Sequence, residues 1–149
     1  MNILINVLLV VGTFFFMEGV AWFTHKYIMH GFLWSWHRSH HKVHPYALEM
    51  NDLFAVVFSI PSILSIYIGI NSYAELWWLF YIGLGILGYG IFYFVFHDII
   101  VHRRIKIPFK AKSRYMKRIM RAHYVHHEKH TKEDGEAFGF LYAPKKYEK

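Results

Sequence analysis

The run His37-Arg38-Ser39-His40-His41 has the spacing H-x2-H-H, and the same spacing recurs at His123-Tyr124-Val125-His126-His127. An H-x4-H pair precedes each run: His25 with His30 before the first, and His97 with His102 before the second. The two pairs are 72 residues apart and the two runs are 86 residues apart, in the same order. Ten of the twelve histidines therefore form two copies of one set.

The spacing within each run is typical of metal ligands on a helix. Positions i, i+3 and i+4 lie on one helix face, so we expect each H-x2-H-H run to direct three imidazoles at a single point. Neutral imidazole binds Zn, Cu, Fe and Ni. Isolated histidines on solvated faces or in a core are the alternative, but they would not repeat two spacings twice. The predicted ligands are His25, His30, His37, His40, His41, His97, His102, His123, His126 and His127. They predict two metal ions or one bridged pair.

The composition indicates a membrane protein. The chain has 149 residues, which favours one domain over 1–149, and 55% of them are hydrophobic and 20% aromatic. A soluble domain of this size has too little interior to bury that much apolar surface. Cysteine is absent, which excludes disulfides, thiolate zinc sites and cysteine-ligated clusters or haem.

Three apolar runs, over residues 3–23, 53–70 and 76–96, are candidates to cross a bilayer. A helix of 21 residues reaches about 30 Å, which is the thickness of the hydrocarbon core. We therefore predict an all-α integral membrane protein with about three to four transmembrane helices and a cytoplasmic helical cap. The third run contains four glycines that favour either close helix packing or a groove for an apolar ligand: Gly83, Gly85, Gly88 and Gly90.

Basic residues predict the topology. Residues 24–52 hold 3 and residues 97–149 hold 14 of the 17 Lys and Arg side chains. By the positive-inside rule both histidine-bearing segments are cytoplasmic. Residues 103–122 are predicted to lie on the membrane surface as an amphipathic segment, with the apolar anchors Ile105, Phe109, Tyr115, Ile119 and Met120. The formal net charge of +7 thus fits a membrane surface better than a nucleic acid.

Several polar residues are candidates to support the ligands from behind. Glu18 lies seven residues before His25 on the same helix face, so it either contacts a metal-bound histidine or lies at the membrane interface. Asn51 and Asp52 precede an apolar run and are expected to cap its helix, with contact to a histidine as the alternative. Pro45 should end the preceding helix near His44. The further candidates are Asp98, His44 and His130.

Other histidine chemistries fit the sequence less well. It contains neither the H-E-x-x-H pattern of zinc proteases nor the Glu-x-x-His pattern of ferritin-like sites. A haem electron carrier with two axial histidines is the main competitor, but it does not need triplets of histidines at helix ends. A metal transporter would need ligands near the bilayer midplane, and only Glu18 approaches that depth.

The four histidine motifs on one side of a few membrane helices resemble those of the fatty acid hydroxylase superfamily of membrane di-iron enzymes. The surrounding stretches narrow the resemblance to bacterial β-carotene hydroxylases; they are HKYIMHG at 25–31, NDL at 51–53, HD at 97–98 and FGFLYAP at 138–144. The resemblance implies a non-haem di-iron monooxygenase of the bacterial inner membrane. It would hydroxylate C3 of β-ionone rings with O2, converting β-carotene to β-cryptoxanthin and zeaxanthin. The ten histidines above would be its iron ligands.

Within the same chemistry, a ketolase and a fatty acid or sterol hydroxylase or desaturase remain alternatives. No haem, flavin or bound nicotinamide is expected, and the sequence has no G-x-G-x-x-G fingerprint. Each turnover would then need an external electron donor, which we expect to be a ferredoxin with its reductase. The basic residues expected to contact that donor, or anionic lipid, are Arg103, Arg104, Lys117, Arg118 and Arg121.

Overall fold

Three long helices dominate the computed structural model, which describes residues 2–42 and 48–148. They are α1 (Ile3–Phe23), α3 (Asp52–Asn71) and α4 (Tyr73–Tyr93), and each belongs to a segment long and apolar enough to cross a membrane. No strand occurs in the described ranges. The predicted all-α membrane fold with three spanning helices is confirmed.

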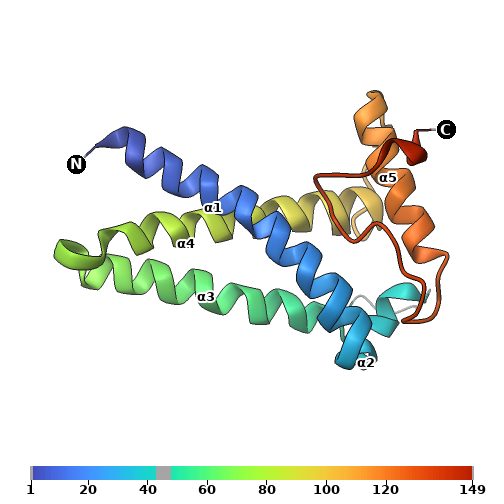
Figure 1. Cartoon of the computed structure of the whole chain (residues 1–149), viewed down its shortest axis with the longest axis horizontal. Coiled ribbons are helices and arrows are strands. Elements are labelled where there is room, and N and C mark those ends of the chain that lie inside the picture. Colours follow the sequence, from blue (N-terminus) through green and yellow to red (C-terminus); the bar gives the residue numbers. More distant parts are fainter. Residues whose placement is uncertain (1, 43–47, 149) are drawn as a thin grey trace.

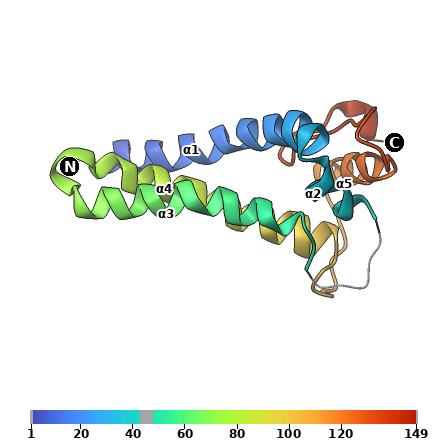
Figure 2. The ribbon, with the colours of Figure 1, turned by 90° about the horizontal axis from the view of Figure 1, so that it is seen from below.

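The helices run between two ends of an elongated molecule (Figure 1). Helix α1 leads from the N-terminus to the far end, α3 returns, and α4 runs back alongside α1. The N-terminus and the α3–α4 link therefore share one end, while α2, α5 and the C-terminus gather at the other (Figure 2). We call this second end the cap; it holds all the described histidines.

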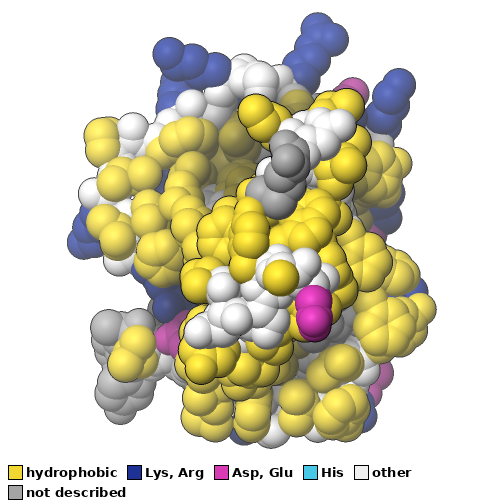
Figure 3. Space-filling model, turned by 90° about the vertical axis from the view of Figure 1, so that its left-hand side faces the viewer, with side chains coloured by type: hydrophobic (Ala, Val, Ile, Leu, Met, Phe, Trp, Pro, Cys, Tyr) yellow, Lys and Arg dark blue, Asp and Glu magenta, His cyan; other side chains and the backbone are white. Residues whose placement is uncertain are grey.

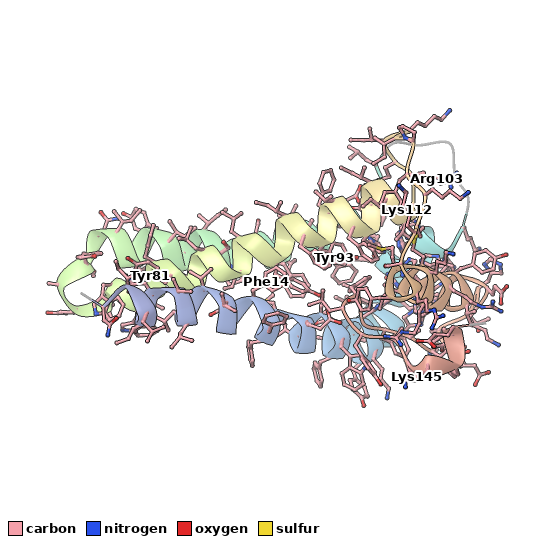
Figure 4. All side chains as sticks on the ribbon, turned by 90° about the horizontal axis from the view of Figure 1, so that it is seen from above. Phe14, Tyr81, Tyr93, Arg103, Lys112 and Lys145 are labelled. Carbon is pink, nitrogen blue, oxygen red and sulfur yellow. The ribbon has the colours of Figure 1, made fainter. Side chains whose placement is uncertain are left out.

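The outer faces of the three long helices are apolar. Ile3, Phe16 and Ile63 expose 77%, 70% and 62% of their surface. Hydrophobic side chains cover most of the face at the N-terminal end, and no histidine is visible there (Figure 3). The labelled Arg103, Lys112 and Lys145 lie at the cap end, far from Tyr81 (Figure 4). An apolar belt with charges gathered at one end is what a spanning bundle requires.

Glycines let the three helices approach closely. A Cβ atom added to Gly83 would lie 2.6 Å from Ile66 Cγ1 and 2.9 Å from the Ser62 carbonyl oxygen. One added to Gly85 would lie 2.6 Å from Thr13 Cβ, on α1. At Gly83 and Gly85 the structure therefore shows close helix packing, and not a groove for an apolar ligand. Gly90 has nothing within 4 Å of the added atom and lines a cavity instead.

We expect Gly83→Leu to destabilise the bundle strongly. Its side chain would collide with the backbone of α3, and overpacking of this kind typically costs about 1–3 kcal/mol. Thermal unfolding of the purified protein in detergent measures the effect. Gly12→Leu is the matched control, because Gly12 is exposed and a Cβ there meets nothing within 4 Å. Equal melting temperatures for the two variants would contradict this packing.

Helices α1 and α4 continue into the cap as π-helices. These are η1 (Thr24–Phe32) and η3 (Phe94–Val101), and η1 contains a kink at Gly31. Next along the chain come α2 (Trp34–His37) and the 3₁₀ turn η2 (Arg38–His41). The turn ends before the predicted stop near His44, which lies outside the described residues.

Helix α5 (Arg114–His127) begins where the Ser113 hydroxyl accepts a hydrogen bond from the Met116 N–H. Residues 103–112 are not helical, so only the second half of the predicted amphipathic segment over 103–122 forms a helix; its position on the membrane surface stays a prediction. The prediction that Ile119 anchors this segment in the membrane is wrong, because Ile119 is 2% exposed and packs in the cap core with Phe96 and Ala143. A short 3₁₀ turn, η4 (Lys145–Tyr147), closes the chain against this core.

Candidate metal centre

The ten predicted ligands converge into two groups of five within the cap. In each group, one ring nitrogen from each of the five histidines lies within 4.8 Å of the corresponding nitrogens of the other four. The first histidine group is His25, His30, His37, His41 and His126, and the second histidine group is His40, His97, His102, His123 and His127. Such convergence of neutral donors is the arrangement that a metal ion needs.

Each H-x2-H-H run is divided between the two groups. His37 and His41 join the first group, whereas His40 between them joins the second. In the second run the division is reversed: His126 joins the first group, whereas His123 and His127 join the second. The expectation that each run aims three imidazoles at one point is therefore wrong. Consecutive residues of a helix are about 100° apart, so positions i+3 and i+4 point to different sites.

The π-helices explain the H-x4-H pairs. In an α-helix, residues five apart are about 140° apart around the axis, which would separate His25 from His30. A π-helix hydrogen-bonds residue i to residue i+5 and so brings these two residues onto nearly the same face. The same geometry unites His97 with His102 in the second group. The five-residue spacing is thus a sequence signal for π-helix at these two places.

Oxygen atoms hold the outer nitrogens of four imidazoles in the first group. The C-terminal segment supplies three backbone carbonyl oxygens. That of Phe138 lies 3.0 Å from Nδ1 of His25, that of Lys132 lies 3.3 Å from Nδ1 of His30, and that of Glu136 lies 2.8 Å from Nδ1 of His126. The His37 Nδ1 lies 2.7 Å from Asn51 Oδ1. Sequence patterns could not reveal the carbonyls, because every residue has one.

Carboxylates take this role in the second group. The His40 Nδ1 lies 2.9 Å from Glu49 Oε1, and the His97 Nδ1 lies 3.0 Å from Asp98 Oδ1. Glu49 was not among the predicted site residues, since nothing in its spacing marks it. Carboxylates and carbonyls behind the ring are the usual outer partners of metal-bound histidines.

These oxygen partners determine where the imidazole protons lie. A carbonyl or carboxylate oxygen only accepts, so the facing Nδ1 carries the proton and Nε2 of a neutral ring carries a lone pair. The Nε2 atoms of His25 and His37 lie 3.1 Å apart, and those of His40 and His97 lie 3.0 Å apart. Lone pairs that face each other at this distance repel unless a cation lies between them. The structure therefore fits a metal ion in each group.

Burial keeps these rings neutral. Desolvation lowers the pKa of His41 and of His102 to about 4, and it lowers the pKa of His126 to about 3. The positive Arg104 also lowers the pKa of His102. Metal binding requires the unprotonated ring, so the cap presents its ligands in the competent form at neutral pH. Within the described part of the chain the buried Nε2 of His127 has no hydrogen-bond partner, which also fits a metal ligand.

Asn51 and Asp98 contact ligands directly. The prediction that the Asn51 side chain caps helix α3 is wrong, since this side chain makes no capping hydrogen bond. The alternative, contact with a histidine, is what the structure shows, because Asn51 binds His37. Asp52 forms no hydrogen bond or ion pair with an imidazole of the described residues; it forms an ion pair with Arg104 at 2.7 Å. His130 Nδ1 donates to the His41 carbonyl at 2.9 Å, so it supports the backbone of the first group.

Glu18 anchors the C-terminal segment in place of the predicted contact with His25. Its Oε1 accepts hydrogen bonds from the backbone N–H groups of Phe140 and Leu141, each at 2.8 Å. Its Oε2 accepts from the Tyr89 hydroxyl at 2.8 Å. The carboxylate reaches the site indirectly, because the segment it holds carries the Phe138 carbonyl that binds His25.

Two of the five predicted surface cations are engaged inside the cap. Arg104 forms ion pairs with Glu49 and Asp52, and Arg118 pairs with Glu148 at 2.6 Å. These guanidiniums balance carboxylates of this chain, and their role in docking an electron donor or anionic lipid stays a prediction. Arg103, Lys117 and Arg121 are exposed.

An apolar cavity of about 460 Å³ adjoins the first group. It lies among α1, α3 and α4, and its lining includes His25, Phe54, Phe58, Tyr93 and Phe140. Phe140 also packs on imidazoles of both groups, with its ring centroid 5.8 Å from His25 and 5.1 Å from His97. Ile63 and Ile91 line the cavity and are 62% and 56% exposed, so it opens sideways between α3 and α4.

The sequence from residue 10 to residue 143 matches the fatty acid hydroxylase family. The chain belongs to this family. In this hydroxylase the matched region contains all ten clustered histidines, so the family match and the site cover the same part of the chain. No solved structure is significantly similar to it.

Curated relatives of the hydroxylase come from bacteria and plants. It is 47% identical to a β-carotene hydroxylase of Pantoea ananas, over 93% of this chain and 78% of the relative. It is 41% identical to a β-carotene hydroxylase of Paracoccus sp. strain PC1, over 92% and 83% of the two chains. It is 34% identical to a chloroplastic β-carotene 3-hydroxylase of Arabidopsis thaliana, over 97% of this chain and 50% of the relative.

Proposed function

We propose that this chain hydroxylates β-ionone rings of carotenoids at C3, converting β-carotene to β-cryptoxanthin and zeaxanthin. The observation that carries the proposal is an apolar cavity that opens toward lipid and adjoins the first of the two five-histidine groups. The names of the bacterial and plant relatives support the same substrate.

The proposed cofactor is a pair of iron ions, one in each histidine group. Bound there, the irons would supply the chemistry that activates O2, which no side chain of this protein can supply. Clusters of five imidazoles favour two separate ions over a haem, which takes only one or two axial ligands. The proton positions on His25, His37, His40 and His97 support this choice, since each directs a lone pair inward.

The protein itself would bind and orient the ring. Aromatic and aliphatic side chains of α3 and α4 form the cavity walls, which exclude water from the unactivated ring carbon. Phe140 lines the cavity and packs on imidazoles of both histidine groups, so a ring lying against it would be beside both groups. A ligand insoluble in water would enter through the side opening, between α3 and α4.

The reaction consumes one O2 and two electrons for each hydroxyl group, with the second oxygen atom leaving as water. We propose that the electrons come from a ferredoxin and its reductase. The cap would face the cytoplasm of a bacterial inner membrane, because the basic residues gather at its end. Of the exposed cations there, Arg103, Lys117 and Arg121 are candidates for the donor or for anionic lipid. Donor-supported turnover that is insensitive to salt would exclude electrostatic docking.

Expression in a bacterium that accumulates β-carotene tests the function. Pigments are then separated by chromatography and weighed by mass spectrometry. We expect products heavier by one and then two oxygen atoms, with an unchanged polyene spectrum. A ketone product or altered lipid would point to another oxidation on the same site. Unaltered β-carotene, with the protein in the membrane and iron supplied, would refute the proposal.

Gly90→Leu should block the substrate without disturbing the metal site. A Cβ at this position meets nothing within 4 Å, so the larger side chain can extend into the cavity. We expect at least a tenfold loss of hydroxylation with unchanged metal content; tenfold corresponds to about 1.4 kcal/mol. Gly12→Leu, on the outer face of α1, serves as the control. Wild-type turnover of Gly90→Leu would show that the substrate binds elsewhere.

A further inference from the structure

The two histidine groups differ in the charge of the atoms behind their rings. In the first group four Nδ1 atoms face uncharged oxygens: the carbonyls of Phe138, Lys132 and Glu136, and the amide of Asn51. In the second group the Nδ1 atoms of His40 and His97 face the carboxylates of Glu49 and Asp98. The sequence repeat made the two ligand sets look equivalent, and their surroundings show that they are not.

Arg104 lies among the carboxylates beside the second group. It contacts three of them: that of Glu49, that of Asp52 at 2.7 Å and that of Asp98 at 4.0 Å. The Glu49 side chain is 5% exposed and that of Asp98 is 13% exposed, so water screens the charge of these two carboxylates weakly.

We propose that Glu49 and Asp98 make the second histidine group the stronger electron donor, so that the two metal sites are chemically inequivalent. An anionic acceptor draws the Nδ1 proton and raises the basicity of the ring toward the metal. A more basic ligand set stabilises the higher oxidation state. The second-group iron is then the more easily oxidised of the two, and Glu49 and Asp98 are positioning residues that act through His40 and His97. This inference rests on the proposed di-iron function.

Mössbauer spectroscopy of the whole protein, loaded with ⁵⁷Fe and fully reduced, tests the proposal together with a redox titration. We expect two quadrupole doublets of equal area and two reduction potentials. Glu49→Gln and Asp98→Asn keep an oxygen acceptor and remove the charge. Each should shift one doublet only, raise only the lower potential, and weaken the binding of one iron by about 10–100-fold.

Two further variants separate charge from structural damage. Asn51→Asp places a carboxylate behind His37, so it should shift the other doublet and lower the higher potential. Glu148→Gln removes a cap carboxylate that pairs with Arg118 and contacts no imidazole; it should leave both doublets in place.

The results separate a failure of this inference from a failure of the proposed di-iron function. A single doublet in the wild-type protein, or equal shifts of both doublets in Glu49→Gln and Asp98→Asn, would overturn the inference and leave the di-iron function standing. Protein that binds no iron would overturn both. If Glu49→Gln does not fold, Asp98→Asn alone decides.

Discussion

Replacing His126 by alanine is expected to abolish hydroxylation while the protein still inserts into the membrane. His126 is fully buried, and its Nε2 lies 3.3 Å from that of His30 in the first histidine group. The three long helices that carry insertion do not include this residue. We expect turnover to fall by at least about 100-fold, since even residues behind metal ligands are often worth 10–100-fold. His40→Ala should do the same through the second group.

Carotenoid analysis of whole cells, combined with immunodetection in isolated membranes, measures this effect. Tyr124→Ala is the matched control, because Tyr124 lies on the same helix and is 66% exposed. The control should retain activity. Wild-type turnover by either histidine variant would remove that histidine from the proposed ligand set.

The second large effect is expected for Glu18→Ala. This change removes the acceptor for the Phe140 and Leu141 N–H groups and for the Tyr89 hydroxyl. Leaving a buried donor unsatisfied costs about 1–3 kcal/mol, and here three donors lose their partner. The segment that binds His25 should then detach, so we expect a lower melting temperature together with a loss of at least tenfold in turnover and of iron.

Two milder variants, Glu18→Gln and Tyr89→Phe, should lose less stability than Glu18→Ala. The glutamine amide oxygen can still accept from both backbone N–H groups, so most of the stability should remain. Tyr89→Phe removes only the hydroxyl, which is worth about 0.5–1.5 kcal/mol. Melting temperatures in detergent and iron content should therefore rank the alanine variant lowest. An alanine variant as stable and active as the other two would contradict the anchoring role of Glu18.

Hydropathy and histidine spacing predict most of this molecule. The run 3–23 coincides with α1, and the runs 53–70 and 76–96 overlap α3 and α4 to within a few residues. A bilayer imposes this regularity, because each spanning backbone must satisfy its own hydrogen bonds. The ten histidines converge for a similar reason, since a metal site fixes residue type as well as position.

Features that depend on tertiary contacts were beyond the sequence. The joining of His126 to four histidines of the N-terminal half depends on tertiary packing. Backbone carbonyls such as that of Phe138 carry no sequence signal. Arg104 looked like a surface cation because its acidic partners, Glu49 and Asp52, are more than 50 residues away in the chain.

The central claim is that the two histidine groups each hold one metal ion, and iron content tests it most directly. Purified protein loaded with iron would be analysed for metal per chain and by absorption spectroscopy, beside His37→Ala and His97→Ala, which each remove one predicted ligand from one group. The account predicts about two irons per wild-type chain, a loss of iron in each variant, and no haem absorption band. Two irons retained in both variants, or a haem band in the wild-type protein, would contradict it.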